Sequence, residues 1–224
     1  MTPSARVISV QVGVPREMGR EDAPEVFDRP WTSGIFKTPV SGPAFVNATG
    51  IAGDAQADLT VHGGPDKAIC VYSADNYPRW TGILWPEPGA FGAFGENLSV
   101  AGVVEEDVCI GDVWAAGDLR LQVSQPRQPC WKLARKWRIQ DLTDQVIQTG
   151  RTGWYFRVLH GGDIAAGTTL SLVERPAPEW TIIAANHVMH GRPRNAAAAG
   201  VLAAVPQLSA SWRATLQKRV DAGA

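Results

Sequence analysis

The fold class of this 224-residue chain is decided by one stretch, Val108-Cys109-Ile110-Gly111-Asp112-Val113-Trp114-Ala115-Ala116-Gly117-Asp118-Leu119-Arg120-Leu121-Gln122-Val123. It holds three short apolar runs, at 108–110, 113–115 and 119–123, which are separated by two Gly-Asp pairs. β-Branched and aromatic residues favour strands, whereas Gly and Asp favour tight turns. The stretch therefore predicts three short β-strands joined by turns.

The same pattern continues on both sides of this stretch. Apolar residues alternate over 6–14, and short apolar runs occupy 35–40, 69–72, 98–100, 153–159 and 169–173. Many short strands at close spacing predict a barrel or sandwich rather than a doubly wound sheet. Two helical segments interrupt them, 73–80 with Ser73 as N-cap and 141–149 ended by Gly150. The predicted class is mainly β with α, that is, α+β.

The character of the chain changes after residues 175–178. The segments 180–190, 196–204 and 209–220 all have helical character, and Leu208, Trp212, Leu216 and Val220 follow one another at four-residue spacing. We therefore predict a β domain over residues 1–176 and a small C-terminal three-helix domain over residues 177–224.

Composition and charge narrow the classes of partner. A formal net charge of −1 and a pI near 6.4 give no electrostatic footprint for nucleic acid or for an anionic membrane. The sequence shows no secretory signal pattern and no apolar stretch approaching the roughly 18 residues that a membrane span needs. We expect a cytoplasmic protein that acts on a small molecule, and the sequence leaves its oligomeric state open.

The three cysteines are widely spaced and include no Cys-x-x-Cys pair. This pattern gives no support to a disulfide framework, a zinc site or an iron–sulfur cluster. Cys70 and Cys109 lie in apolar, strand-like surroundings, so core packing is the expected role for both.

Cys130 has a different setting, in the run Ser124-Gln125-Pro126-Arg127-Gln128-Pro129-Cys130-Trp131-Lys132-Leu133. Two prolines stiffen this loop, and the neighbouring cations Arg127 and Lys132 favour the thiolate over the thiol. The thiolate is both the nucleophile and the metal ligand, so Cys130 is the leading functional residue. Trp131 beside it is suited to shield a metal or to stack on a flat base.

Several separate segments together resemble the MOSC domain family, named for the C-terminus of molybdenum cofactor sulfurases. They are Val61-His62-Gly63-Gly64-Pro65-Asp66-Lys67-Ala68, Gly95-Glu96-Asn97-Leu98, Gly111-Asp112, the Cys130 run and Thr152-Gly153-Trp154, in that order. More narrowly, the chain resembles the standalone bacterial YiiM-type members, which are associated with resistance to 6-N-hydroxylaminopurine and carry a C-terminal three-α domain. The resemblance implies a MOSC-type β-barrel with helical insertions and a pocket for the molybdenum cofactor.

The family's cysteine matches Cys130. In relatives that reduce substrates it supplies a sulfur ligand to molybdenum, whereas in sulfurase-type relatives it has been proposed to carry sulfur. A thiolate suits molybdenum held by a pterin dithiolene, because that centre is soft and rich in sulfur. The motif alone does not choose between the two roles.

The pterin ends in a phosphate, so its pocket needs cations and backbone N–H donors. Arg127, Lys132, Lys67 and Arg151 are the candidate cations, and the turn that contains His62, Gly63 and Gly64 resembles a phosphate cradle. That turn has an alternative explanation, because its glycines can simply supply positive φ. Glu96 and Asn97 likewise either contact the cofactor or substrate, or fix the entry to a strand.

The leading hypothesis is a molybdenum-dependent oxidoreductase that converts N–OH to N–H and water, with hydroxylaminopurine-type bases as substrates. The departing oxygen needs a proton donor, and His62 and Glu96 are the first candidates. Without cluster-binding cysteines or a dinucleotide fingerprint, the electrons must come from a separate flavin or iron–sulfur reductase.

Two other functions fit the same residues. In one, Cys130 holds a persulfide and acts as a sulfur carrier; in the other, the protein binds or delivers the molybdenum cofactor without turnover. Pyridoxal phosphate is disfavoured because it requires a Schiff-base lysine, and no lysine here has a setting that singles it out.

Overall fold

The structure of the chain is a computed structural model that describes residues 3–85 and 89–223. Seven strands form a closed mixed β-barrel in the order β13-β9-β10-β11-β7-β8-β1, and the pairing of β1 with β13 closes it. Only the β7–β8 pairing in this ring is parallel. The barrel strands are β1 (Ser4–Val12), β7 (Ile69–Ser73), β8 (Leu98–Ala101), β9 (Val113–Ala116), β10 (Leu119–Pro126), β11 (Trp154–His160) and β13 (Thr169–Glu174). The predicted barrel and its α+β class are confirmed.

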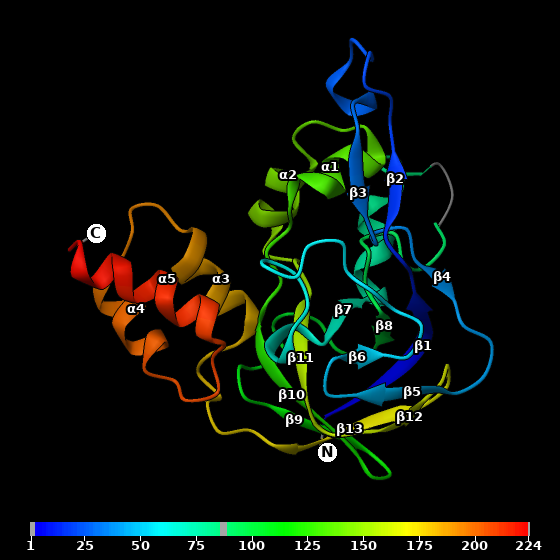
Figure 1. Ribbon diagram of the computed structural model, residues 1–224. Coiled ribbons are helices and arrows are strands. Elements are labelled where there is room, and N and C mark those ends of the chain that lie inside the picture. The colour runs from blue at the N-terminus through cyan, green and yellow to red at the C-terminus, as the bar shows by residue number, and fades with distance from the viewer. Residues whose placement is uncertain (1–2, 86–88, 224) are drawn as a thin grey trace.

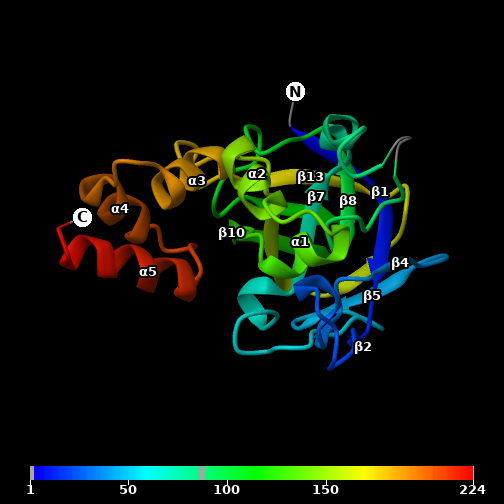
Figure 2. The same ribbon diagram turned by 90° about the horizontal axis from the view of Figure 1, so that it is seen from above.

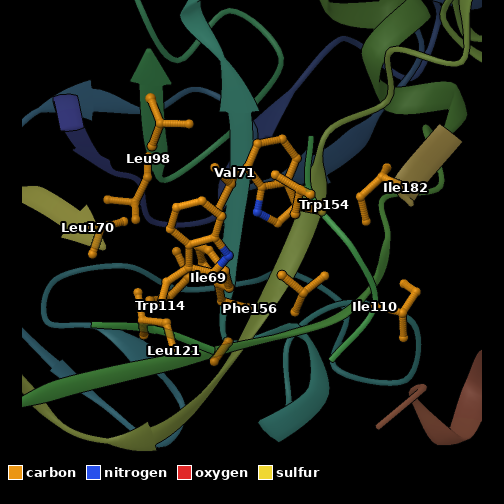
Figure 3. Close-up of a cluster of buried hydrophobic side chains, with 14 of the residues drawn as sticks. Ile69, Val71, Leu98, Ile110, Trp114, Leu121, Trp154, Phe156, Leu170 and Ile182 are labelled. Carbon is orange, nitrogen blue, oxygen red and sulfur yellow. The ribbon is translucent and has the colours of Figure 1, made fainter. Parts of the chain in front are cut away.

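Alternation along the strands builds the barrel core. On β10, Leu119, Leu121 and Val123 point inward and are fully buried, because successive side chains of a strand face opposite sides. Figure 3 shows Trp114 and Phe156 among the side chains gathered between the strands. Burying each large apolar side chain contributes about 1.5–3 kcal/mol, so this cluster is the main source of stability.

The structure corrects the prediction of a strand over 108–110. Cys109 forms only an isolated bridge with Thr181, at the start of the C-terminal helices. Asp112 explains the irregular backbone, because its carboxylate accepts from the Cys109 N–H at 2.9 Å and holds Arg175 in an ion pair. The segment therefore connects the barrel to the helical region.

Smaller elements surround the barrel. A hairpin of β2 (Arg16–Met18) and β3 (Trp31–Ser33) projects at the top of Figure 1, beside α1 (Trp131–Trp137). The remaining strands are β4 (Thr38–Pro39), which pairs with β1, and the sheet of β12 (Gly162–Ile164), β5 (Ala44–Asn47) and β6 (Gly50–Ile51). Three 3-10 helices cover Val26–Asp28, Pro65–Lys67 and Ala74–Trp80. Ser73 caps the last of these, as predicted, although the helix is 3-10 rather than α.

Two α-helices follow β10 and pack on a second apolar cluster that includes Tyr72 and Phe94. The sequence predicts α2 (Leu142–Thr149) and its end at Gly150, where φ is +68°. It does not predict α1 (Trp131–Trp137), which begins directly after Cys130 and is anchored by the buried Leu133. The Cys130 run is therefore a loop that leads into a helix.

The C-terminal region contains three helices, α3 (Ile182–His190), α4 (Ala196–Ala203) and α5 (Ala210–Asp221). Side-chain N-caps begin all three, at Thr181, Asn195 and Ser209. Figures 1 and 2 both show the helices as a lobe on one side of the barrel. Their buried residues belong to the same continuous apolar cluster as the barrel strands, so the lobe is packed against the barrel. No helix in the described residues has the length and apolarity to cross a membrane.

Candidate functional site

A single pocket brings together most of the residues singled out in the sequence. Its walls come from the end of β3 and the β3–β4 connection, the loop and turn over residues 55–67, β7, the segment before β8, the Cys130 run and β11. The predicted residues that line it are Cys130, Arg127, Lys132, His62, Gly63, Lys67 and Asn97. Segments far apart in the chain thus converge on one cavity.

Cys130 is placed by the start of α1. The Cys130 carbonyl accepts the first helical hydrogen bond, from the Leu133 N–H at 2.9 Å, and a further one from Thr143 Oγ1 at 3.3 Å. Pro129 fixes the backbone on the other side. The thiol is half-buried and lines the pocket, so it is accessible to a ligand bound there.

Arg127 is buried beside Cys130 and only partly hydrogen-bonded. Its Nη2 donates to the Phe94 carbonyl at 2.6 Å, whereas its Nη1 is buried without any hydrogen-bond partner. It forms no salt bridge with a described residue. A guanidinium stays protonated in proteins, and a buried unpaired charge is costly. This point of the pocket is therefore suited to an anion.

The turn before β7 supplies one further cation, Lys67, and the imidazole of His62 to the pocket. Gly63 and Gly64 have φ values of +75° and +79°, which favour glycine, and a Cβ at Gly63 would lie 2.6 Å from Gln56 Oε1. Burial and the nearby cations Lys132, Lys67 and Arg127 lower the pKa of His62. Burial also lowers the pKa of Lys67, whose Nζ donates to the Val61 carbonyl at 2.8 Å.

Part of the pocket wall is uncharged. Cys70 and Tyr155 both line it, and burial raises the pKa of both groups, that of Cys70 to about 11. Asn97 holds this wall in place, because its Oδ1 accepts from the Cys70 N–H at 3.0 Å and its Nδ2 donates to the Gln11 carbonyl at 3.2 Å. Cys70 is buried as predicted, yet it also borders the cavity, whereas Cys109 is packed away from it.

Glu96 does not line the pocket. Its buried carboxylate accepts from the Tyr77 hydroxyl, from the N–H groups of Gly92 (2.8 Å) and Phe94 (3.0 Å), and from Ser99 Oγ (2.8 Å). Of the two sequence-based explanations for Glu96, the geometry favours a structural role that shapes the segment before β8.

Arg151 and Gly64 also lie outside the pocket lining. Arg151 pairs with Glu106 at 2.9 Å and with Glu105 at 3.7 Å, and its Nη1 contacts Asn76 at 3.3 Å. Its charge is therefore balanced within the protein. Gly64 contributes its backbone conformation to the turn.

Several lining residues escaped the sequence-based search. They are Lys37, Gln56, Gln128 and Tyr155, together with the β3–β4 residues Ser33, Gly34 and Ile35. Only Gln128 carried a usable signal, because it lies between the two prolines of the Cys130 run. Lys37 is held in a buried ion pair with Asp54, which no local pattern indicates.

The C-terminal helices contact the back of the His62–Lys67 turn through Asp66. The Asp66 carboxylate accepts from the Ala210 N–H at the start of α5 (3.0 Å) and pairs with Arg157 of β11 (2.5 Å). The Asp66 carbonyl accepts from Ser124 Oγ at 2.5 Å. The turn, the Cys130 run and α5 are therefore tied together behind the pocket.

Comparison with known families and proteins adds to this geometry. The profile of the MOSC domain matches residues 58–171, and that of the YiiM-like 3-alpha helix domain matches residues 180–223. The uncharacterized protein YflK of Bacillus subtilis is 41% identical over 215 residues, which cover 96% of this chain and 94% of YflK. The crystal structure of YiiM from Geobacillus stearothermophilus has a TM-score of 0.78 at 41% identity, covering 96% of this chain and 98% of YiiM.

A third relative is much longer. A protein of Gibberella moniliformis named "Reductase" is 43% identical over 164 residues, which cover 72% of this chain and 29% of that protein. The matched segment in that relative is thus part of a larger polypeptide.

Proposed function

The chain belongs to the MOSC domain family and carries a YiiM-like 3-alpha helix region, and from this membership we propose that it binds a molybdenum–pterin cofactor and reduces N-hydroxylated substrates. The observation that carries the proposal is the shared pocket of Cys130 and the unpaired buried guanidinium of Arg127. MOSC membership and the relative named "Reductase" support a redox role.

The residues of the pocket fit such a cofactor. Cys130 offers a soft sulfur ligand, which suits molybdenum in a dithiolene environment. Arg127 Nη1 has a free donor in the buried part of the pocket, and Lys67 and Lys132 add two more cations to the lining. An anionic group bound there would remove the cost of a buried unpaired charge.

The reaction is the conversion of R–NH–OH, two electrons and two protons to R–NH₂ and water. When bound, the molybdenum centre supplies the two-electron redox chemistry. Cys130 and the cations would hold the cofactor, while Cys70 and Tyr155 add neutral side chains to the wall of the pocket. His62 is the proton donor that we propose, because it lines the pocket and Glu96 does not.

Hydroxylaminopurine-type bases are the substrate class that we propose. We also propose that the electrons come from a separate flavin or iron–sulfur reductase. The long relative named "Reductase" supports a partnership of this kind, because the segment that matches this chain makes up only 29% of that protein.

The experiment that tests the function is the molybdenum and pterin content of protein purified without oxygen from a molybdate-supplied host that makes the cofactor. We expect near-equimolar molybdenum and pterin in the wild type and loss of molybdenum in Cys130→Ser. Cys109→Ser is the matched control, because Cys109 is buried outside the pocket. Reduction of 6-N-hydroxylaminopurine by the loaded protein, with reduced methyl viologen as electron donor, then tests turnover.

Each alternative predicts a different result. A protein that holds molybdenum and pterin but does not reduce the substrate would be a cofactor-binding or delivery protein. A protein without either, in which mass spectrometry finds a persulfide on Cys130, would be a sulfur carrier.

A further inference from the structure

We propose that the rim of the pocket is the docking surface for the electron-donating protein, and that this donor presents an acidic face around its redox centre. The proposal rests on the proposed function and names the kind of partner that the site requires. It follows from the apolar residues of the rim, from the charge of α1 and from the position of Trp131.

Large apolar side chains are exposed on the two segments that frame the pocket. Leu59 and Val61, in the loop that also supplies His62, are 74% and 53% exposed. Trp131, which follows Cys130, is 54% exposed. The two segments border the same pocket, because His62 of one and Lys132 of the other both line it. Exposed apolar side chains thus adjoin the pocket on both segments, as at a protein interface.

Trp131 has the surroundings of an interface anchor. Its ring lies 5.9 Å from that of Trp31 on β3, and the Arg135 guanidinium carbon lies 5.5 Å and 5.3 Å from the two ring centres. Lys132 Nζ lies 5.8 Å from the Trp131 ring. Tryptophan and arginine carry a large share of the binding energy of protein interfaces. Figure 1 shows β3 and α1 side by side at the top of the molecule.

The charge of this rim selects the partner. Residues 131–138 contain four cations, Lys132, Arg135, Lys136 and Arg138, and no acid, in a chain with a net charge of −1. Arg138 is paired with Asp28 and Lys136 is buried against backbone carbonyls, whereas Lys132 forms no salt bridge with a described residue. Arg135 donates only to backbone carbonyls, so it keeps its charge. Arg135 and Lys132 thus outnumber Asp58, the acid beside Leu59, and this excess of positive charge favours an acidic partner and speeds its approach.

The location of the rim fits electron delivery. The donor's redox centre must come close to Cys130. Trp131 is the next residue in the chain and is exposed, so a protein that docks on Trp131 also lies close to Cys130. A small organic electron donor can enter the pocket without docking on the rim. A rim variant should therefore slow turnover with a protein donor but not with a small organic donor.

The test compares two rim variants, Leu59→Glu and Trp131→Glu, with Val201→Glu as matched control. Neither Leu59 nor Trp131 lines the pocket, so the geometry does not favour the metal-shielding or base-stacking role that the sequence suggests for Trp131. Val201 is 61% exposed and lies on α4, in the C-terminal lobe. Turnover of 6-N-hydroxylaminopurine is measured with reduced methyl viologen, and with an acidic flavodoxin and an acidic [2Fe–2S] ferredoxin, each kept reduced by NADPH and its reductase. Molybdenum content is measured for every variant.

We expect both rim variants to lower kcat/KM for a protein donor at least tenfold, with viologen turnover and molybdenum content unchanged. Val201→Glu should match the wild type with all donors. The KM for the protein donor should also rise when ionic strength increases from about 0.01 to 0.1 M, because the Debye length falls from about 30 to 10 Å.

Three results would overturn the docking surface. One is an equal loss with viologen and with the protein donor, another is no loss with the protein donor, and the third is a wild type that turns over with viologen but with neither protein donor. A wild type that does not turn over even with viologen would instead contradict the proposed function, and the docking surface would fall with it.

Discussion

The Gly95–Asn97 segment and the Cys130 run differ in how completely their polar side chains are hydrogen-bonded. Glu96 is buried with four donors around its carboxylate. Arg127 is equally buried, yet its Nη1 has no partner. Both segments belong to the motifs that resemble the MOSC family. The difference indicates that the first motif builds the wall and that the second leaves binding capacity for a ligand.

The largest expected effect is at Glu96, the residue of the two whose polar atoms are hydrogen-bonded. Glu96→Leu leaves the donors of Tyr77, Gly92, Phe94 and Ser99 unpaired, so we expect a loss of about 3 kcal/mol or more in the free energy of unfolding. Urea unfolding measures it.

The same substitution at an exposed carboxylate is the control. Glu174→Leu changes an exposed residue at the end of β13 that forms no salt bridge with a described residue, and it should change stability by less than about 0.5 kcal/mol. A Glu96→Leu protein of nearly wild-type stability would mean that Glu96 is available for chemistry.

Arg127→Met should show the opposite pattern. It removes a buried charge that has no acid partner but also the hydrogen bond to the Phe94 carbonyl, so the free energy of unfolding should change by less than about 1 kcal/mol, while pterin retention should fall at least tenfold. Pterin per chain and urea unfolding are measured on the same preparation. Arg120→Met is the control, because Arg120 donates only to carbonyls of its own turn. Full pterin retention in Arg127→Met would refute the anion site.

A smaller effect on stability and on pterin retention is expected at Asp66, which connects the His62–Lys67 turn to β11 and α5. Asp66→Asn weakens the ion pair with Arg157 and the tie to α5, and should cost about 1–2 kcal/mol of stability. Pterin retention should fall a few-fold because the His62–Lys67 turn loses support. Asp28→Asn, which breaks the exposed pair with Arg138, should change neither quantity. Loss of stability without loss of pterin would show that the tie is only structural.

The smallest effect is a shift in the titration of His62. Burial and three cations lower its pKa, so an anion in the pocket should raise it. Inorganic phosphate should therefore move the His62 NMR titration upward, and the His62→Gln spectrum assigns the signal among the four histidines. A titration unchanged by phosphate would place the anion elsewhere.

The sign of the stability effect follows from the same shift. The folded pKa of His62 lies below the unfolded value of 6.5, so the unfolded state takes up the proton first as pH falls. Neutral His62 therefore costs no free energy of unfolding above pH 6.5, and the free energy of unfolding decreases as pH falls below 6.5. His62→Gln should lose less stability over that range than the wild type.

The barrel strands and the three C-terminal helices were predicted from local patterns. Alternating apolar residues and turn pairs specify β9 and β10, and apolar residues at four-residue spacing specify α5. Helix α1 was missed because Pro126 and Pro129 indicate a loop, and its apolar face is set by contact with the cluster around Phe94. Residues 108–110 do not form the predicted strand, because the Asp112 carboxylate accepts a hydrogen bond from the Cys109 N–H.

The sequence by itself determined the fold class, the C-terminal helices and the choice of Cys130, because propensity, periodicity and the charges next to one cysteine are local properties. Tertiary structure alone decided which polar residues have partners. The Tyr77 hydroxyl reaches Glu96 across 19 positions of the chain, and Arg151 reaches Glu106 across 45. One nitrogen of Arg127, by contrast, meets no partner. Hydrogen-bond satisfaction depends on contacts between distant segments, so only the folded chain separates the residues of the wall from those left to bind a ligand.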